Sequence, residues 1–512
     1  MNNRNLLIVA IISCIILFVG LGGVPLLDPD EPVYAQTPKE MLAAHDLLSP
    51  RIYGDYWYDK PPMYYWLVAG SFHLFGINEF AARFPSALMG LGCVLYLFCA
   101  VRRLLNETAA FWSAMVMVTS LGFFYIAKAA VTDMTLNLFL MIAFISLFER
   151  RYWLTALAAG LAVVTKGPVG LLFPGAVLTL YSLVSGEWKS RWNGKLLCSF
   201  LIFFAVVLPW YGYMVHYHGD AFVDTFLGFH NLTRFTSPEH PETNRWYFYF
   251  PVLLVGLFPW TALLPRGIYD VFVKRTGREQ EFLVYVCLWF MLIFVFFTVS
   301  STKLVSYILP SYPAAAILIG AAISRLTLNW QEQVKAREWL GGGLAMIGLF
   351  IAGWYFALRT MPELTSGVIV LIGCLLLGGC WFAVALWRRE WTQAAWSQVL
   401  MSVVFSLVLI LQLFPAAAPR FASNQMAVSL QQHYDGISPL YIVKFLRPGL
   451  AFYGDLYGIP MDKETIEETI TATSGKTFFV MHDRELKVLS PAVASSLTLL
   501  VQHEDKMLLL RQ

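Results

Sequence analysis

Charged residues are scarce in this chain of 512 residues. They make up 13% of the sequence, whereas hydrophobic residues make up 58% and the mean hydropathy is +0.61. A soluble globular protein carries about 25% charged residues, so this composition excludes an ordinary soluble enzyme. The net charge of +3 is too small to indicate a nucleic-acid partner. The composition therefore predicts an integral membrane protein.

Cysteines are few, and no pair has the C-x-x-C spacing of a zinc site. We also find no internal repeat and no low-complexity segment. All the cysteines fall in apolar segments, which excludes a disulfide framework and favours small buried hydrophobic side chains. The seven cysteines are Cys14, Cys93, Cys99, Cys198, Cys287, Cys374 and Cys380.

The first apolar segment lacks the features of a cleaved leader. Residues 6–24 are apolar, and the segment ends in Gly22-Gly23-Val24-Pro25 without a small-residue cleavage site. Because the apolar core of a leader is also shorter, we expect an uncleaved first transmembrane helix.

Long apolar stretches occupy most of the chain. Taking about twenty apolar residues per crossing, we predict an all-α polytopic membrane protein with about thirteen transmembrane helices. Their approximate limits are 5–25, 80–101, 108–127, 133–148, 152–165, 167–184, 196–216, 246–264, 281–299, 304–323, 340–358, 366–387 and 396–415.

Basic residues occur in alternate loops, as the positive-inside rule expects for a cytoplasmic N-terminus. The basic loops contain Arg102-Arg103, Arg150-Arg151, Lys189, Arg191, Lys195, Lys274, Arg275, Arg278, Lys335, Arg337 and Arg388-Arg389. The outer side then receives the segments 26–79, 128–133, 165–168, 217–245 and 300–303 and the C-terminal region.

The region after the last apolar segment has a different pattern. Strand-like runs at 440–443, 477–481, 497–501 and 507–510 accompany a helical pattern at 463–471. Strands mixed with a helix predict a small α/β domain. We therefore expect two domains, a membrane domain at 1–415 and a soluble extracytoplasmic domain at 416–512.

Acidic residues gather directly after the first apolar segment. Asp28, Asp30 and Glu31 lie there, and Tyr58-Asp59-Lys60-Pro61-Pro62 follows in the same loop. Charges at the edge of a membrane are costly and usually face a polar cavity or a partner. We interpret this loop as one wall of a catalytic cavity, the alternative being a solvated loop. Residues 31–48 and those after Pro61-Pro62 predict two helices on the membrane surface.

Other polar side chains fall on the same predicted side of the membrane. They are Asp133, Lys166 before Gly167-Pro168, His230, Arg234, His240, Lys303 and Tyr307. Each has a plainer alternative. Lysines at helix ends also extend toward lipid headgroups, histidines and the aromatic residues at 56–66 also line membrane interfaces, and the sequon at Asn231 is a short pattern that arises by chance.

Together these motifs resemble a family, the bacterial polyprenyl-phosphate-dependent glycosyltransferases related to protein O-mannosyltransferases, which include the lipid A aminoarabinose transferases. The resemblance covers residues 1–415. Its motifs are Asp30-Glu31, Asp59-Lys60-Pro61-Pro62 with Tyr65-Trp66, Asp133, Lys166-Gly167-Pro168, His230-Asn231 with Arg234-Phe235, and Thr302-Lys303-Leu304 with Tyr307 and Leu309-Pro310.

The resemblance implies a GT-C membrane fold, a polyprenyl-phosphate-linked sugar as donor, and inversion at the anomeric carbon. It implies a periplasmic active site in the bacterial inner membrane, with lipid A or another outer-leaflet glycolipid as acceptor. Residue roles follow by position. The catalytic candidates are Asp30, Glu31 and Asp133, the carrier-phosphate contacts are Lys60, Lys303 and Arg234, and the substrate contacts are Tyr58, Asp59, Lys166, His230 and Tyr307.

One position departs from the aminoarabinose transferases. They carry an arginine where this chain has Val33, so Lys60, with Lys303 or Arg234, would bind more of the phosphate charge. Asp59 with His230 is a candidate pair of ligands for a divalent metal ion, and no other cofactor is indicated.

Two other functions stay open. The second enzyme function is transfer of the sugar to a protein hydroxyl. The charges also suit a transporter of lipid-linked sugars, although transporters bind substrate near the membrane midplane. We expect a monomer.

Overall fold

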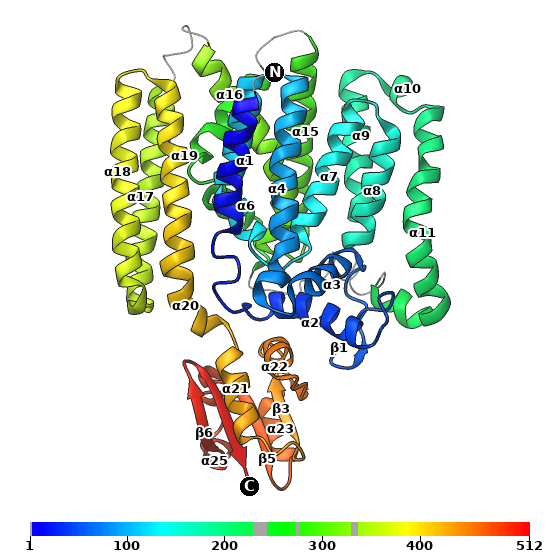
Figure 1. Cartoon of the computed structure of the whole chain (residues 1–512), viewed down its shortest axis with the longest axis vertical. Coiled ribbons are helices and arrows are strands. Elements are labelled where there is room, and N and C mark those ends of the chain that lie inside the picture. The colour runs from blue at the N-terminus through cyan, green and yellow to red at the C-terminus, as the bar shows by residue number, and fades with distance from the viewer. Residues whose placement is uncertain (1–2, 227, 229–242, 273–276, 329–335) are drawn as a thin grey trace. The chain divides into compact units, whose positions relative to one another are not determined.

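The computed structural model describes residues 3–226, 228, 243–272, 277–328 and 336–512 (Figure 1). The chain forms two compact units. The first contains Met1–Val19, Tyr58–Tyr64 and Phe84–Ile410, and the second contains Gly20–Trp57, Tyr65–Arg83 and Leu411–Gln512. The predicted α/β region thus groups with most of the first outer loop, while the domain boundary at 415 stays a prediction.

The first unit is helical throughout the part that the structure describes. Its elements are α1 (Asn3–Phe18), most of α4 (Glu79–Leu104), α5 (Glu107–Thr119), α6 (Leu121–Ala127), α7 (Asp133–Phe148), α8 (Tyr152–Lys166), α9 (Val169–Ser185), α10 (Trp188–Arg191), α11 (Gly194–Phe222), α13 (Tyr249–Gly256), η3 (Thr261–Leu263), α14 (Leu264–Phe272), α15 (Arg278–Val299), η4 (Val305–Ser311), α16 (Tyr312–Leu328), α17 (Ala336–Thr360), η6 (Pro362–Leu364), α18 (Thr365–Trp387) and α19 (Trp391–Val408).

Seven helices among the described residues are long and apolar enough to cross a bilayer, or up to nine if each of two bent pairs is one span. The bent pairs are α5 with α6, at 64°, and α13 with η3 and α14, at 111°. Four shorter apolar helices, α1, α7, α8 and α9, occupy the other predicted positions. A polytopic helical membrane protein is thereby confirmed.

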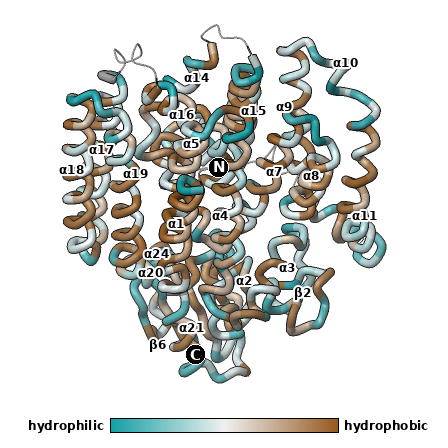
Figure 2. Tube along the Cα trace, turned by 45° about the horizontal axis from the view of Figure 1, so that its top comes forward, coloured by the Kyte–Doolittle hydropathy of each residue, from teal (hydrophilic) through white to brown (hydrophobic). Residues whose placement is uncertain are grey.

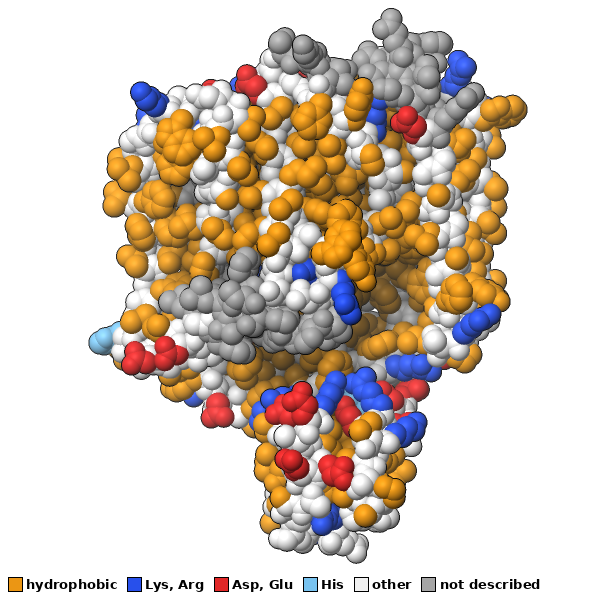
Figure 3. Space-filling model, turned by 180° about the vertical axis from the view of Figure 1, so that it is seen from behind, with side chains coloured by type: hydrophobic (Ala, Val, Ile, Leu, Met, Phe, Trp, Pro, Cys, Tyr) orange, Lys and Arg blue, Asp and Glu red, His pale blue; other side chains and the backbone are white. Residues whose placement is uncertain are grey.

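Apolar side chains also cover the outside of the helices. Leu201 on α11 is 74% exposed and Leu377 on α18 is 76% exposed. Figure 2 shows long hydrophobic stretches along α17, α18 and α19, and the space-filling view in Figure 3 shows a helical flank that is mostly hydrophobic. Exposed apolar surface on this scale is what a lipid-facing helix requires.

The second unit combines two juxtamembrane helices with a sheet domain. Its elements are α2 (Asp30–Ala43), β1 (Arg51–Ile52), β2 (Asp55–Tyr56), most of α3 (Met63–Phe75), most of η7 (Leu409–Leu413), α20 (Phe414–Phe421), α21 (Asn424–His433), β3 (Leu440–Val443), α22 (Arg447–Gly454), β4 (Ile459–Met461), α23 (Ile466–Ala472), β5 (Thr477–His482), α24 (Asp483–Leu486), α25 (Pro491–Ser495), β6 (Thr498–His503) and β7 (Lys506–Arg511). Helices α2 and α3 lie where the sequence predicts surface helices.

The C-terminal sheet has the order β4-β3-β5-β7-β6, with β3 parallel to β4 and β5, and β7 antiparallel to β5 and β6. Alternate side chains of a strand point to opposite faces, and both faces are apolar here. Phe478 and Val480 pack with residues of α21 and α22, whereas Phe479 and Met481 pack with Ile470 of α23. The predicted α/β domain is therefore confirmed, with helices on both faces of its sheet.

The packing of Tyr312 gives a test of the helical unit. Its hydroxyl lies so close to Gly122 of α6 and Gly256 of α13 that a Cβ atom at either glycine would overlap it. We expect Gly256→Ala to lower the free energy of unfolding by about 1–3 kcal/mol, the usual cost of overpacking. The thermal unfolding midpoint in detergent measures this change.

Gly212→Ala on α11 is the matched control, because no atom lies within 4 Å of a Cβ atom there. It should leave the midpoint unchanged or raise it, since alanine favours a helix over glycine. Adding Tyr312→Phe should restore part of the stability that Gly256→Ala removes. Equal midpoints for Gly256→Ala and Gly212→Ala would contradict the packing described here.

Candidate functional site

A lysine and an aspartate form an ion pair at one end of the helical unit. Asp133 is the first residue of α7, and Lys166 is the last residue of α8. Their charged atoms lie 2.7 Å apart, and the Asp133 side chain is only 10% exposed. The positions suit the charges, because a helix N-terminus favours an anion and a helix C-terminus favours a cation. This pair joins two residues that the sequence predicts for the site.

The turn after Lys166 depends on a glycine. Gly167 has φ 86° and ψ −154°, a backbone conformation that residues with a Cβ atom rarely adopt. Pro168 follows and caps α9. The K-G-P motif therefore ends α8 sharply and holds the Lys166 ammonium at the end of α8.

Three further predicted residues surround this pair. The Lys166 ammonium lies 5.1 Å from the centre of the Tyr307 ring, a cation–π geometry. Asp59 is near enough to Lys166 to interact with it electrostatically, and its carboxylate lies 2.7 Å from the Lys60 ammonium. Residues from four separate segments thus form one charged cluster, as the sequence predicts.

Tyr58 contacts His218, a residue that the sequence does not single out for the site. Its hydroxyl lies 3.1 Å from Nδ1 of His218 on α11, and its ring packs edge-on against Phe222. His218 is the second residue after the predicted span 196–216, in the segment Val215-His216-Tyr217-His218. Two histidines at a helix end are the signal that would have identified it.

Lys303 differs from Lys60 and Lys166 in the groups that its ammonium contacts. Its ammonium donates a hydrogen bond to Asn244 Oδ1 at 3.1 Å and another to the carbonyl oxygen of Ser300. Within the described part of the chain no carboxylate pairs with Lys303, whereas Lys60 and Lys166 each have an aspartate. Lys303 is 2% exposed, and burial lowers its pKa. An anionic ligand would supply the missing negative charge.

The charged cluster lies at the start of α7, and two arginines lie at the opposite end of this helix. Glu149, directly after α7, pairs with Arg103 at 3.2 Å and with Arg151 at 3.3 Å. The 16 residues of α7 separate these pairs from Asp133 by roughly 24 Å, at 1.5 Å per residue. The cluster and the basic loops therefore occupy opposite ends of one apolar helix.

In the second unit, Asp30 and Glu31 begin α2 but have different environments. Asp30 is exposed, whereas Glu31 is buried. Arg83 donates two hydrogen bonds to the Glu31 carboxylate, at 2.6 and 2.7 Å. It also donates to the carbonyl oxygens of Val24 and Pro25. Glu31 therefore holds the loop in shape, and its catalytic role stays a prediction.

Arg83 is a second residue that the sequence analysis missed. It is the one charged residue in the predicted span 80–101. A lone arginine in an apolar span usually has a buried acidic partner, which would have pointed to Glu31.

Two predicted site residues, His230 and Arg234, lie outside the described residues. The metal pair of Asp59 and His230 is therefore untested. In the described ranges, no three His, Cys, Asp or Glu side chains gather as metal ligands would.

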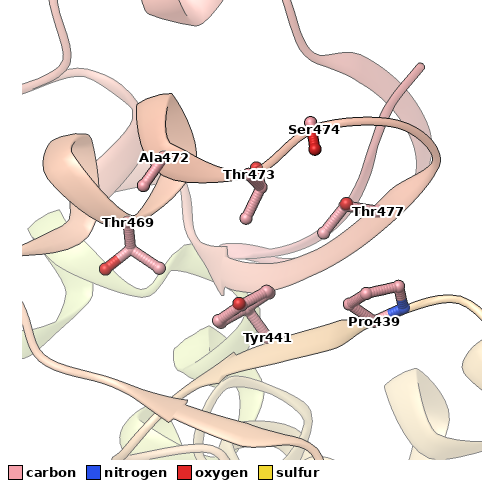
Figure 4. A pocket seen from close by; sticks show the side chains of 7 residues that line it. All are labelled: Pro439, Tyr441, Thr469, Ala472, Thr473, Ser474 and Thr477. Carbon is pink, nitrogen blue, oxygen red and sulfur yellow. The ribbon is translucent and has the colours of Figure 1, made fainter.

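The C-terminal sheet carries a separate recess of about 390 Å³ (Figure 4). Its lining is uncharged and rich in hydroxyl groups, and comprises Pro439, Tyr441, Thr469, Ala472, Thr473, Ser474 and Thr477. A lipid phosphate needs a cation, and none lines this recess. This recess therefore lacks the cation that an anionic ligand requires, whereas the charged cluster of the helical unit contains two lysines.

Comparison with known proteins assigns the family. A relative from Pseudomonas aeruginosa (strain UCBPP-PA14), described as undecaprenyl phosphate-α-4-amino-4-deoxy-L-arabinose arabinosyl transferase, is 30% identical over 428 residues, which are 80% of this chain and 75% of the relative. The chain belongs to this family. It is a glycosyltransferase that uses a lipid-phosphate-linked sugar as donor. The corresponding protein of Edwardsiella ictaluri is 27% identical over 437 residues, 80% of this chain and 78% of that one.

Residues 59–213 match the family described as dolichyl-phosphate-mannose-protein mannosyltransferase. The structure of ArnT from Cupriavidus metallidurans bound to undecaprenyl phosphate is similar over 100% of this chain and 98% of that one, with a TM-score of 0.79 and 22% identity. An oligosaccharyltransferase from Archaeoglobus fulgidus is similar over 97% of this chain and 73% of that one, with a TM-score of 0.58 and 12% identity. These structures confirm the predicted GT-C fold.

The Asp133–Lys166 pair gives a test of the cluster. Lys166→Met leaves a buried carboxylate without its cation, so we expect the free energy of unfolding to fall by about 3–5 kcal/mol. The double variant Asp133→Asn with Lys166→Met removes both charges and should regain most of this loss. Thermal unfolding in detergent measures both.

Lys195→Met, at an exposed lysine near the start of α11, is the control and should leave the midpoint unchanged. If the single variant were as stable as the double variant, Lys166 would not neutralise Asp133.

Proposed function

We propose that this glycosyltransferase transfers 4-amino-4-deoxy-L-arabinose, or a related sugar, from undecaprenyl phosphate to lipid A or another outer-leaflet glycolipid. The names of the relatives support the donor sugar, at 27–30% identity. The proposal depends on the environment of Lys303. In the described part of the chain its buried ammonium is hydrogen-bonded only to neutral oxygen atoms. A lipid phosphate would complete this site.

We assign the carrier phosphate to Lys303, with Lys60 and Arg234 assisting. When the acceptor oxygen attacks the anomeric carbon, the bond from that carbon to the phosphate oxygen breaks, and its electron pair passes to the phosphate. The departing lipid phosphate is anionic, so a fixed cation stabilises the charge that develops on it. Such preorganised electrostatic contacts contribute on the order of 10²–10³ in rate. The attack inverts the anomeric centre.

We assign the acceptor to Asp30. It stands exposed at the first turn of α2, where the helix dipole favours the ionised carboxylate that a base requires. A hydroxyl acceptor would give its proton to Asp30, which typically contributes about 10²–10⁴ in rate. A phosphate acceptor is already deprotonated, and Asp30 would then orient the acceptor or the sugar amine.

Asp133, Lys166, Tyr307, Asp59 and Tyr58 are proposed to bind and orient the sugar. Their ion pairs and ring contacts fix them before substrate arrives. Prearranged groups lose less entropy when substrate binds.

We place the reaction on the periplasmic side of the bacterial inner membrane. The charged cluster lies at the end of α7 that is remote from the arginine pairs of Glu149, and basic loops face the cytoplasm.

Protein O-glycosylation is the second candidate. The match of residues 59–213 to the dolichyl-phosphate-mannose-protein mannosyltransferase family favours it. Labelled sugar that migrates with protein instead of lipid would decide for this alternative.

Lys303→Met tests the phosphate assignment. We expect the rate of transfer to fall on the order of 10²–10³-fold and the KM for the donor to rise, because the ammonium contacts the donor before and during reaction. The assay measures sugar transfer from undecaprenyl phosphate to lipid by mass spectrometry of extracted lipids, with expression and thermal unfolding checked in parallel.

Asp30→Asn should lose turnover with little change in the KM for the donor, because Asp30 acts on the acceptor. Lys195→Met is the charge-matched control and should retain wild-type kinetics. Full activity in both Lys303→Met and Asp30→Asn would overturn the assignments.

A further inference from the structure

The peptide that leads into Asp30 is fixed by three successive backbone hydrogen bonds. The amide of Leu26 donates to the Tyr453 hydroxyl at 2.7 Å. The amide of Leu27 donates to Glu31 Oε2 at 2.9 Å, and the amide of Asp28 donates to the carbonyl oxygen of Phe421 at 2.8 Å. Tyr453 and Phe421 both come from the C-terminal domain, residues 416–512. This domain therefore binds the loop two residues before Asp30.

The side chain of Asp28 also contacts the C-terminal domain. Ser423 donates its hydroxyl hydrogen to Asp28 Oδ2. Gly449, in the first turn of α22, lies directly against Oδ1, which is buried, and a Cβ atom at Gly449 would overlap that oxygen. The absence of a side chain at position 449 is what makes room for Asp28.

The buried Lys506 and the half-buried Tyr453 reinforce these contacts. Lys506 on β7 donates to the carbonyl oxygens of Pro419 and Arg420, at 3.1 and 2.7 Å, and so fixes the segment that ends in Phe421. The Tyr453 hydroxyl donates to Glu79 at 3.0 Å.

Helix α2 is also held at its far side. Lys39 forms an ion pair with Asp455 at 2.6 Å and donates to the carbonyl oxygen of Phe452 at 3.2 Å. Helix α22 and the residue directly after it therefore contact both the segment that leads into α2 and the side chain of Lys39. This leaves little freedom for α2 to rotate or shift.

We propose that the C-terminal domain is a positioning element of the transferase, which holds Asp30 through a clamp formed by Asp28, Phe421, Ser423, Gly449 and Tyr453. This inference rests on the acceptor role proposed for Asp30. The clamp residues contact no substrate. They fix the direction of the peptide that enters α2, and a displacement of about 1 Å at a reacting group lowers a rate by as much as about 10²-fold.

The buried position of Asp28 also affects its pKa. Burial raises the pKa of Asp28 to about 7, against the opposing effect of the Ser423 hydrogen bond. The charged groups facing Asp28 are Lys506 from β7, which lowers the pKa, and Glu31 from α2, which raises it. The protonated form is thus favoured in the folded protein below about pH 7, and a neutral amide at this position should fit the clamp.

Two variants break the clamp without touching Asp30. Gly449→Ala displaces the Asp28 carboxyl group, and Ser423→Ala removes its hydrogen bond with little change in volume. We expect kcat to fall about 10-fold or more, within the range for a displaced group. The KM for undecaprenyl-phosphate-linked sugar should stay at the wild-type value, because the donor phosphate is assigned to lysines of the helical unit. Ser496→Ala, at an exposed serine of the same domain, is the control.

Asp28→Asn is the conservative variant and should retain most of the activity that Asp28→Ala loses. The pH dependence of stability should also differ between Asp28→Asn and the wild type. Because the folded pKa is raised above the ordinary value near 4, the contribution of Asp28 to stability is full below pH 4 and is lost as the pH rises to about 7. The thermal midpoint of the wild type should therefore fall relative to that of Asp28→Asn between about pH 4 and pH 7.

Asp30→Asn measured alongside separates the two proposals. If Asp30→Asn is inactive while Ser423→Ala and Gly449→Ala keep the wild-type kcat, the clamp is wrong and the role of Asp30 stands. If Asp30→Asn is fully active, the acceptor role fails and the clamp proposal fails with it. Should Gly449→Ala not fold, Ser423→Ala decides, since it adds no atom. A raised KM for the donor with unchanged kcat would also overturn the clamp.

Discussion

The ion pair between Asp133 and Lys166 shows the constraint on which the rest of this structure depends. A charge at the end of an apolar helix loses hydration, and it is stable only where a partner offsets that loss. Lys166 has Asp133, and Lys60 has Asp59. Lys303 has only neutral oxygen partners among the described residues. This difference between the lysines is the reason that the proposed phosphate contact is Lys303 and the proposed framework contains Lys60 and Lys166.

The same constraint shapes the second unit. Glu31 and Arg83 are both buried, and their pairing fixes the loop after the first apolar helix. The neighbouring Asp30 stays exposed. The adjacent acids Asp30 and Glu31 therefore differ in role. The buried Glu31 fixes the loop, and the exposed Asp30 is the one proposed for the chemistry. The C-terminal domain binds this loop through backbone and side-chain contacts, two residues before a residue proposed for the chemistry.

The sequence predicts the parts of this protein that depend on local composition. Apolar length locates the helices, and short strand-like apolar runs locate β3, β5, β6 and β7. It does not predict β4, a strand of three residues, or α21 and α22, because short elements carry too few residues for a clear period. Motif order brings Asp59, Asp133, Lys166 and Tyr307 together correctly. The partners Arg83 and His218 are missed, because pairing across distant segments depends on tertiary packing.

Purified protein in vesicles, supplied with undecaprenyl-phosphate-linked aminoarabinose and lipid A, gives the most direct test of the central claim. Mass spectrometry would follow the free undecaprenyl phosphate and the sugar on the acceptor together. Glycosyl transfer predicts equal amounts of released carrier phosphate and modified lipid A, and Lys303→Met should lower the rate of formation of both on the order of 10²–10³-fold. Sugar that crosses the vesicle membrane still bound to its carrier, with no new glycosidic bond, would contradict the account.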